Sequence, residues 1–360
     1  MKRFLLLAAI AALPLSCGNR SRSAADPPSE PDTPAVVEIL HGPDSLNDIA
    51  SIFAGLQVDS ASAWFGHTRS SAWQRYAASM DSRWKPCKEG LDKVDAFARD
   101  SLADIRARAK TVFYPFSGPD FAYPATLFPD ADTIITAALE PVGRGLDERS
   151  LNAQFYQKCT PTLSTLMHSS YFITQSMQGD LGTEGLGGVT PVFEFFLRRM
   201  GYEILSVDTD KEKLVIRYFK PGENRVKVLR HYKVNVGDKY MPDWFAAVLD
   251  GLDPSSTVGM IKSCSYLMHK APFSRIRGYM LDKTFAIVQD DTGPRYAKLL
   301  EAGYDVTFYG TFSNPISCFD SSTHQKDLEA AFRKAPVRKI GFRFGYNGAP
   351  LVLVSRHPQR

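Results

Sequence analysis

Short apolar runs of β type alternate with helix-like segments through most of the chain, and this alternation constrains the fold more than any other sequence feature. Strand-like runs occupy residues 109–116, 133–139, 257–267, 285–289, 305–312, 339–346 and 351–355. Helix-like segments separate several of them, at residues 274–281, 295–302 and 324–334. Such alternation is typical of helices packed against a mostly parallel sheet. The sequence therefore predicts an α/β fold with a Rossmann-like sheet flanked by helices.

Residues 109–139 have the outline of a β-α-β unit. A strand-like run leads into a turn at residues 117–120, a short helix-compatible stretch follows, and a second strand-like run ends before Glu140. Parallel neighbouring strands need a crossover of this kind, and the crossover is nearly always right-handed. We therefore expect the two runs to pair in parallel.

Three further patterns complete the predicted architecture. Apolar residues recur at helical spacing in residues 44–56 and 88–108, which predicts a helical N-terminal layer. Residues 213–219 and 225–234 read as two strands with a short turn between them, which predicts an inserted antiparallel hairpin. A second hairpin, with Asn-Gly at 347–348 in its turn, is expected to form an antiparallel edge.

The first 17 residues have the features of a bacterial export signal. Lys2 and Arg3 precede an apolar run at residues 4–15, which is shorter than the roughly 20 apolar residues of a transmembrane helix. The run closes on the sequence LPLSC, which resembles a lipobox and predicts lipid attachment at Cys17. Ordinary cleavage after Ala25 is the alternative.

The predicted lipid anchor gives the chain three parts and a location. Residues 1–17 are the lipoprotein-type signal peptide, and residues 18–35, rich in Ser, Pro and charge, form a flexible tether. Residues 36–360 are expected to form a single α/β globular domain. The protein would then lie in the cell envelope and contact the membrane through its N-terminal lipid, either facing the periplasm or in the outer membrane.

Charge and cysteine content restrict the classes of partner. The formal net charge is +4, and removal of Lys2 and Arg3 with the signal leaves 4 − 2 = +2, so no nucleic-acid partner is expected. No C-x-x-C occurs, which argues against a zinc site. An oxidising compartment would permit up to two disulfides among the four cysteines beyond Cys17, which are Cys87, Cys159, Cys264 and Cys318.

Polar residues follow several of the predicted strands. In an open α/β sheet, ligands bind at the carboxyl ends of the strands. The candidate ligand-binding residues are Ser117, Asp120, Glu140, Lys262, His269, Asp290 and Asp291. The competing interpretation is local structure, since aspartates also cap helices and form turns, and Lys262 would then pair with one of the acids.

The sequence favours a ligand-binding or structural role, with an enzyme as the alternative. Paired carboxylates could act as acid and base in a hydrolase or hold a divalent cation. However, Ser117 lacks the G-x-S-x-G elbow of hydrolases. His324 and Asp327 stand three apart, which is permissible ligand spacing but also common on a solvated helix, and no metal site is expected there.

Three blocks of sequence resemble a family of uncharacterised bacterial envelope proteins, many of which begin as lipoproteins. The blocks are FYPFSGPD at 113–120 with LEP at 139–141, IKSCSYLMH at 261–269, and VQDDTG at 288–293. The resemblance extends over about residues 45–335 and implies an envelope location, with no assigned activity.

The β-α-β outline also resembles the nucleotide-binding half of Rossmann-type methyltransferases, in which an acid such as Glu140 would hold ribose hydroxyls. The turn holds a single glycine, Gly118, and Pro119 removes an amide donor from it. The resemblance therefore implies a shared sheet topology, and no cofactor is expected.

Overall fold

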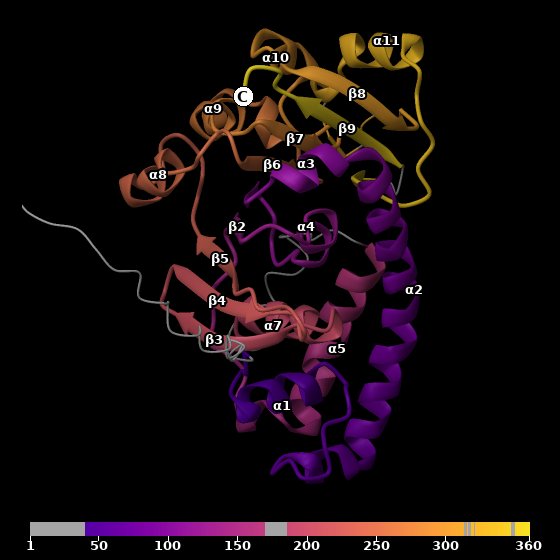
Figure 1. Ribbon diagram of the computed structural model, residues 1–360, viewed down its shortest axis with the longest axis vertical. Helices are drawn as coiled ribbons and strands as arrows, with labels where there is room; N and C mark the ends of the chain where they lie inside the picture. The colour runs from indigo at the N-terminus through magenta and orange to yellow at the C-terminus, as the bar shows by residue number, and fades with distance from the viewer. Residues whose placement is uncertain (1–39, 170–185, 313–314, 316–317, 320, 347–349) are drawn as a thin grey trace, which may run out of the picture. The chain divides into compact units, whose positions relative to one another are not determined.

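The computed structural model describes residues 40–169, 186–312, 315, 318–319, 321–346 and 350–360 (Figure 1). These residues all belong to one contact unit, Ile39–Arg360. The predicted signal peptide, Cys17, the tether and the turn at 347–348 lie outside the described residues. None of the described helices is both long enough and apolar enough to cross a bilayer.

The described strands form one mixed sheet in the order β3-β4-β5-β2-β1-β6-β7-β9-β8. Their bounds are β1 Thr111–Pro115, β2 Thr133–Ala138, β3 Glu203–Thr209, β4 Lys213–Phe219, β5 Lys227–Lys233, β6 Thr257–Ile261, β7 Ala286–Gln289, β8 Asp305–Gly310 and β9 Leu351–Arg356. The five central strands, β5-β2-β1-β6-β7, run parallel. Numbered among themselves in chain order they read 3-2-1-4-5, which is the order of a doubly wound sheet.

The predicted α/β class with flanking helices is confirmed, but the sheet is parallel only at its centre. Antiparallel pairing joins β3 to β4, β4 to β5, β7 to β9 and β8 to β9. Between β3, β4 and β5 the connections are short, and a short turn can join only antiparallel neighbours. The expectation of a mostly parallel sheet holds for the central strands. Antiparallel pairing near both edges was expected from the two predicted hairpins, although the C-terminal strand has other partners than predicted.

The β-α-β unit and the inserted hairpin are both present. β1 and β2 pair in parallel across the short helix α4 (Ala122–Leu127), and β4 pairs with β5 as predicted. The sequence did not reveal β3, which extends the hairpin to three strands. β3 is an edge strand in which Ile204 is the one buried residue, so it lacks the alternation that marks a strand.

Two of the predicted strand-like runs differ from the structure. Within residues 339–346 the described pairing is a single bridge from Phe344 to Pro350, and β9 pairs with β7 and β8 instead. Phe342 and Phe344 are buried in the helical core, which explains the alternating apolar pattern without a strand. β6 stops at Ile261, so the remainder of the predicted run, residues 262–267, is a loop.

The helices cover both faces of the sheet (Figure 1). Their bounds are α1 Asp44–Phe53, α2 Ser71–Ser101, α3 Ala103–Arg108, α5 Ala153–Ser169, α7 Thr190–Arg199, α8 Asp243–Asp250, α9 Ser274–Asp282, α10 Tyr296–Glu301 and α11 Lys326–Lys334, besides α4. Successive side chains of a strand point to opposite faces. Accordingly, Val112 and Tyr114 join a core with α1 to α5 and α7, whereas Phe113 joins a second core with α8, α9 and α10.

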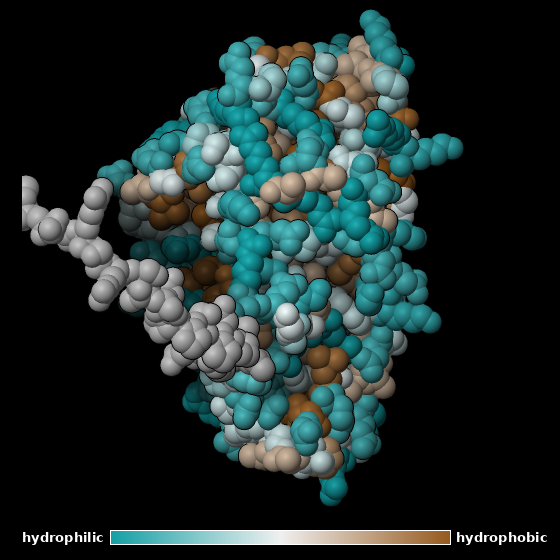
Figure 2. Space-filling model, viewed as in Figure 1, coloured by the Kyte–Doolittle hydropathy of each residue, from teal (hydrophilic) through white to brown (hydrophobic). Residues whose placement is uncertain are grey.

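The N-terminal helical layer is confirmed, and its main element is longer than predicted. α2 begins at Ser71, where the side chain of Ser70 accepts a hydrogen bond from the Trp73 amide, and it continues through Pro86. It packs against α4 and α5, beside which it runs in Figure 1. The face seen in Figure 2 is mostly hydrophilic, with hydrophobic side chains in small separate groups, because the helices turn their apolar sides inward.

Candidate functional site

The sheet order reverses between β1 and β6. After β1 the chain forms β2 to β5 on one side of β1, and it then crosses back to form β6 on the other side. Ligands of doubly wound folds bind at such a reversal, outside the carboxyl ends of the strands. Among the described non-glycine residues, those with positive φ are Phe116, Ser263, Ser265 and Tyr266, at 53° to 59°. All four follow β1 or β6. Strained backbone of this kind clusters at functional sites.

An ion pair lies at this reversal. The Lys262 ammonium is 3.0 Å from Oδ2 of Asp120, and the side chains are 1% and 11% exposed. The Tyr114 hydroxyl donates to the same carboxylate oxygen at 3.2 Å, and burial together with Asp120 raises the pKa of Tyr114. Lys262 also lies 3.9 Å from the ring centroid of Tyr123. The expectation that Lys262 pairs with one of the acids is confirmed.

Asp290 holds together the loops around the site. Its Oδ2 accepts a 2.8 Å hydrogen bond from the Ser263 amide, and its Oδ1 accepts one of 2.9 Å from the Thr292 amide. Gly345 approaches it so closely that a Cβ there would lie 2.6 Å from Oδ2. Burial raises the pKa of Asp290. The carboxylate thus connects the loops after β6 and β7, as the turn interpretation expected.

Asp291 lies in a different setting from its neighbour. The Tyr266 hydroxyl donates to its Oδ2 at 2.6 Å, and burial, followed by the charge of Asp290, raises the pKa of Asp291 to about 7. The ring of His269 packs edge-on against Tyr266, with centroids 5.2 Å apart. Burial lowers the pKa of His269 to about 4, so this imidazole is neutral at pH 7.

Ser117 and Glu140 lie at the neighbouring strand ends. The Ser117 amide bonds to the carbonyl of Ala137, and its hydroxyl donates to the Gly118 carbonyl at 2.9 Å. A hydroxyl held in this way has no base to activate it, which removes the setting of a nucleophile. Glu140 is buried two residues beyond β2, which lies on the side of β1 away from β6.

A cavity of about 450 Å³ lies next to the ion pair. It is lined by α2, α5, Tyr123 of α4 and residues 341–343. Tyr123 is the residue that packs against Lys262. Cys87 of α2 also lines the cavity; burial, and then the charge of Asp120, raise the pKa of its thiol to about 12. Lys262 and Asp120 do not line the cavity, and Tyr123 is the wall residue that also contacts the ion pair.

Sequence reasoning missed the residues on this wall. Tyr123 could have been found, because it follows Asp120 by three positions and its amide bonds to the Asp120 carboxylate at 3.3 Å, as in a helix cap. Cys87 carried no signal, since it lies on a helix more than 30 positions before Asp120 and joins the site only through tertiary packing.

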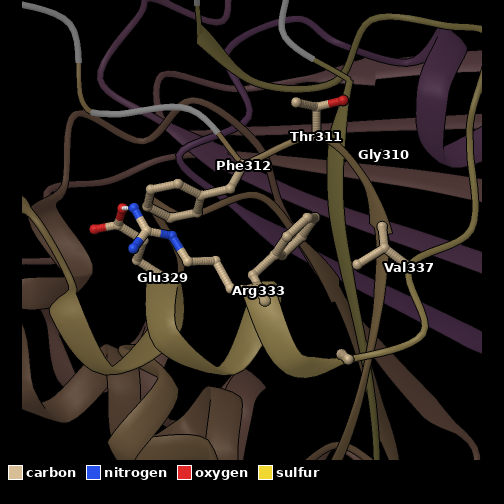
Figure 3. Close-up of a pocket in the computed structure, with 8 residues that line it drawn as sticks. Gly310, Thr311, Phe312, Glu329, Arg333 and Val337 are labelled. Carbon is tan, nitrogen blue, oxygen red and sulfur yellow. Dashed lines mark hydrogen bonds and ion pairs between the residues drawn. The ribbon is translucent and has the colours of Figure 1, made fainter.

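A second cavity, of about 510 Å³, lies between the end of β8 and α11 (Figure 3). Phe312 and Arg333 line it, and Arg333 forms an ion pair with Glu329. Glu329 is also 2.9 Å from the ring of His324, so the partner of His324 here is Glu329. Neither this cavity nor the first is lined by any of the predicted ligand-binding residues.

The described residues contain no group of three or more His, Cys, Asp or Glu side chains placed to hold a metal ion.

The cysteines of the described residues form no disulfide. The four cysteines of the described chain are free: Cys87, Cys159, Cys264 and Cys318. The disulfides that the compartment would permit are therefore absent from this part of the chain.

Comparison with known proteins adds no relationship. No family model matches this sequence, and the search of curated proteins finds no match.

Proposed function

We propose that this chain is a ligand-binding protein of the bacterial cell envelope. In this proposal Cys17 carries the lipid, residues 18–35 form the tether, and the α/β domain binds a small molecule where the sheet order reverses. The resemblance to uncharacterised envelope lipoproteins supports the location. The 3-2-1-4-5 order supports a topology shared with Rossmann-type methyltransferases.

The observation that carries the proposal is the buried Lys262–Asp120 pair beside a cavity. Removing two charges from water is costly, and an apolar pair of similar size often gives equal or greater stability. The pair lies at the one reversal of the parallel strands and beside Tyr123, which lines the cavity. We infer that the pair serves the cavity through Tyr123, because the Lys262 ammonium packs on the ring of this wall residue.

Binding is better supported than catalysis at this site. The hydroxyl of Ser117 is bonded to a backbone carbonyl, and both oxygens of Asp290 are bonded to backbone amides. These contacts give the two side chains structural roles. Asp291, with a pKa near 7, is the residue that favours an acid–base enzyme as the second candidate.

A thermal-shift screen of the full chain against small metabolites tests the proposal. We expect some compounds to raise the Tm of the wild-type chain. The same compounds should leave the Tm of Lys262→Met unchanged from its value without compound. Lys262→Arg, which keeps the charge, should retain part of the increase. Lys298→Met is the control, since Lys298 forms an exposed pair with Glu301 on α10. Increments that survive Lys262→Met would overturn the proposal.

If the second candidate is right, Asp291→Asn should abolish turnover of a substrate and leave its binding intact. Loss of turnover in Ser117→Ala as well would contradict the structural role of Ser117.

A further inference from the structure

The mouth of the cavity beside Tyr123 carries an excess of positive charge. Three exposed cations line it, which are Arg83, Lys93 and Arg343, against one carboxylate, Glu89. Among the described residues, no salt bridge involves any of these three cations. Unpaired charges of one sign around a low-dielectric hollow attract ligands of the opposite sign.

The interior of the same cavity is apolar. Leu91 of α2, Met167 of α5 and Phe342 are buried side chains that line it, and Tyr123 adds an aromatic face. Its volume of about 450 Å³ lies within the range of natural small-molecule sites, which are mostly apolar with a few polar groups that orient the ligand. A ligand that fits would have an apolar body.

Two residues of α2 keep this wall of the cavity free of large side chains. Pro86 and Gly90, four positions apart and therefore on one face of α2, both line the cavity. Both residues disfavour a helix interior. Pro86 has no amide hydrogen, so the Ser82 carbonyl, which is also on this wall, loses its helical partner. A Cβ at Gly90 would meet no atom within 4 Å, so glycine leaves open space.

We propose that this cavity binds a small organic anion, a carboxylate or sulfonate with an apolar or aromatic body, whose charge lies among Arg83, Lys93 and Arg343. The inference rests on the proposed binding function and specifies the class of ligand. The body of the ligand packs on Met167 and Phe342, and the charged end remains at the mouth.

Calorimetric titration of the full chain with three matched compounds tests the proposal. The compounds are 4-phenylbutyrate, 4-phenylbutylammonium and 4-phenylbutan-1-ol, which share a body and differ in charge. We expect the anion to bind about tenfold more tightly than the cation, with the alcohol between them. Lys93→Gln combined with Arg343→Gln should remove this preference and leave binding of the alcohol unchanged.

Two further variants locate the site. Gly90→Phe should fill the cavity and abolish binding of all three compounds, whereas Gly90→Ala adds a single methyl group and should not. Lys88→Gln is the control for charge, because Lys88 is exposed on the same helix and pairs with Asp92. The substitutions at the mouth change exposed side chains, so the charge test does not depend on a buried substitution.

The outcomes separate the two proposals. Equal affinity for the three compounds, or an anion preference that survives the loss of Lys93 and Arg343, overturns the anion class and leaves the binding function intact. Absence of binding by any compound, or binding unaffected by Gly90→Phe, overturns the cavity as the site. The proposed binding function itself is overturned only if the compounds raise the Tm of Lys262→Met as much as they raise the Tm of the wild-type chain.

Discussion

The ammonium nitrogen of Lys262 lies 3.0 Å from a carboxylate oxygen of Asp120, although 142 positions separate the two residues in the chain. Lys262 is the first residue after β6, and Asp120 ends the turn that follows β1. The contact therefore joins the two halves of the parallel sheet at the point where they diverge. Both side chains are nearly buried, so each depends on the other for its charge.

Removal of one partner should destabilise the fold strongly. Lys262→Met leaves the Asp120 carboxylate buried without its cation, and we expect a loss of about 3–5 kcal/mol in the free energy of unfolding. Lys262→Met combined with Asp120→Leu should recover most of it, because neither position of the pair then carries a charge. Urea unfolding measures both. A loss below about 1 kcal/mol, as expected for the exposed pair Lys298–Glu301, would contradict the prediction.

Asp291 should make stability fall as pH rises. Burial and the charge of Asp290 raise its pKa to about 7 in the folded chain, from 3.8 in the unfolded chain. Between these values the folded chain binds more protons than the unfolded chain, so this stabilisation is complete below about pH 4 and is lost by about pH 7. Asp291→Asn keeps an acceptor for the Tyr266 hydroxyl and has no proton to lose.

Urea unfolding of wild type and Asp291→Asn across pH 4.5–7.5 checks this prediction. Relative to wild type, the variant should gain stability steadily toward the upper end of the range. A constant difference between the two proteins would show that Asp291 titrates near its ordinary pKa in the folded state.

Two glycines should respond in opposite directions to alanine. Gly90 lies inside α2 with open space around its Cα, so Gly90→Ala should stabilise the fold by up to about 1 kcal/mol. Gly345 has φ of +92°, and a Cβ there would lie 2.6 Å from Asp290 Oδ2. Gly345→Ala should therefore destabilise by more than about 1 kcal/mol. Thermal melts that rank the two variants in the reverse order would contradict the described geometry.

Lipid attachment predicts a labelling result. Cells that express the full chain should incorporate radiolabelled palmitate into it, and Cys17→Ser should abolish the label, because the acyl chains are carried by this cysteine. Cys318→Ser is the matched control, since Cys318 is an exposed free cysteine of the domain. Label that persists in Cys17→Ser would rule out Cys17 as the anchor, and absence of label from the wild-type chain would favour cleavage after Ala25.

The local patterns of the sequence predicted the central sheet well, and the edges poorly. The β-α-β unit and the β4–β5 hairpin are built from contacts close in sequence, where apolar runs and turn residues specify both the element and its partner. β3 pairs with the next strand in the chain but lacks an alternating apolar pattern, and β9 pairs with β7 and β8, which lie farther away in the sequence. The burial of Phe342 and Phe344 gave residues 339–346 the alternation of a strand, although these side chains pack in the helical core. An alternating apolar pattern therefore indicates which side chains are buried, but it does not indicate that the segment pairs as a strand.

The candidate site was predictable where strand ends alone position the residues. The rule for carboxyl ends selected Asp120, and the cost of an unpaired buried charge predicted that Lys262 pairs with one of the acids, which the structure confirms. The cavity was not predictable, because its wall comes from α2 and α5, whose positions over the sheet are set by tertiary packing. The interruptions at Pro86 and Gly90 were visible in the sequence, but nothing local indicated which surface they face.

The final strand of the chain is an interior strand of the sheet. β9 ends at Arg356 and lies between β7 and β8, and β8 has no other neighbour in the described sheet. A nascent chain therefore cannot complete this half of the sheet until residues 351–356 have been synthesised. A product truncated before Leu351 would leave two unpaired strand edges, which are templates for aggregation and targets for proteases. Cellular proteases and chaperones should accordingly act most strongly on chains that lack β9.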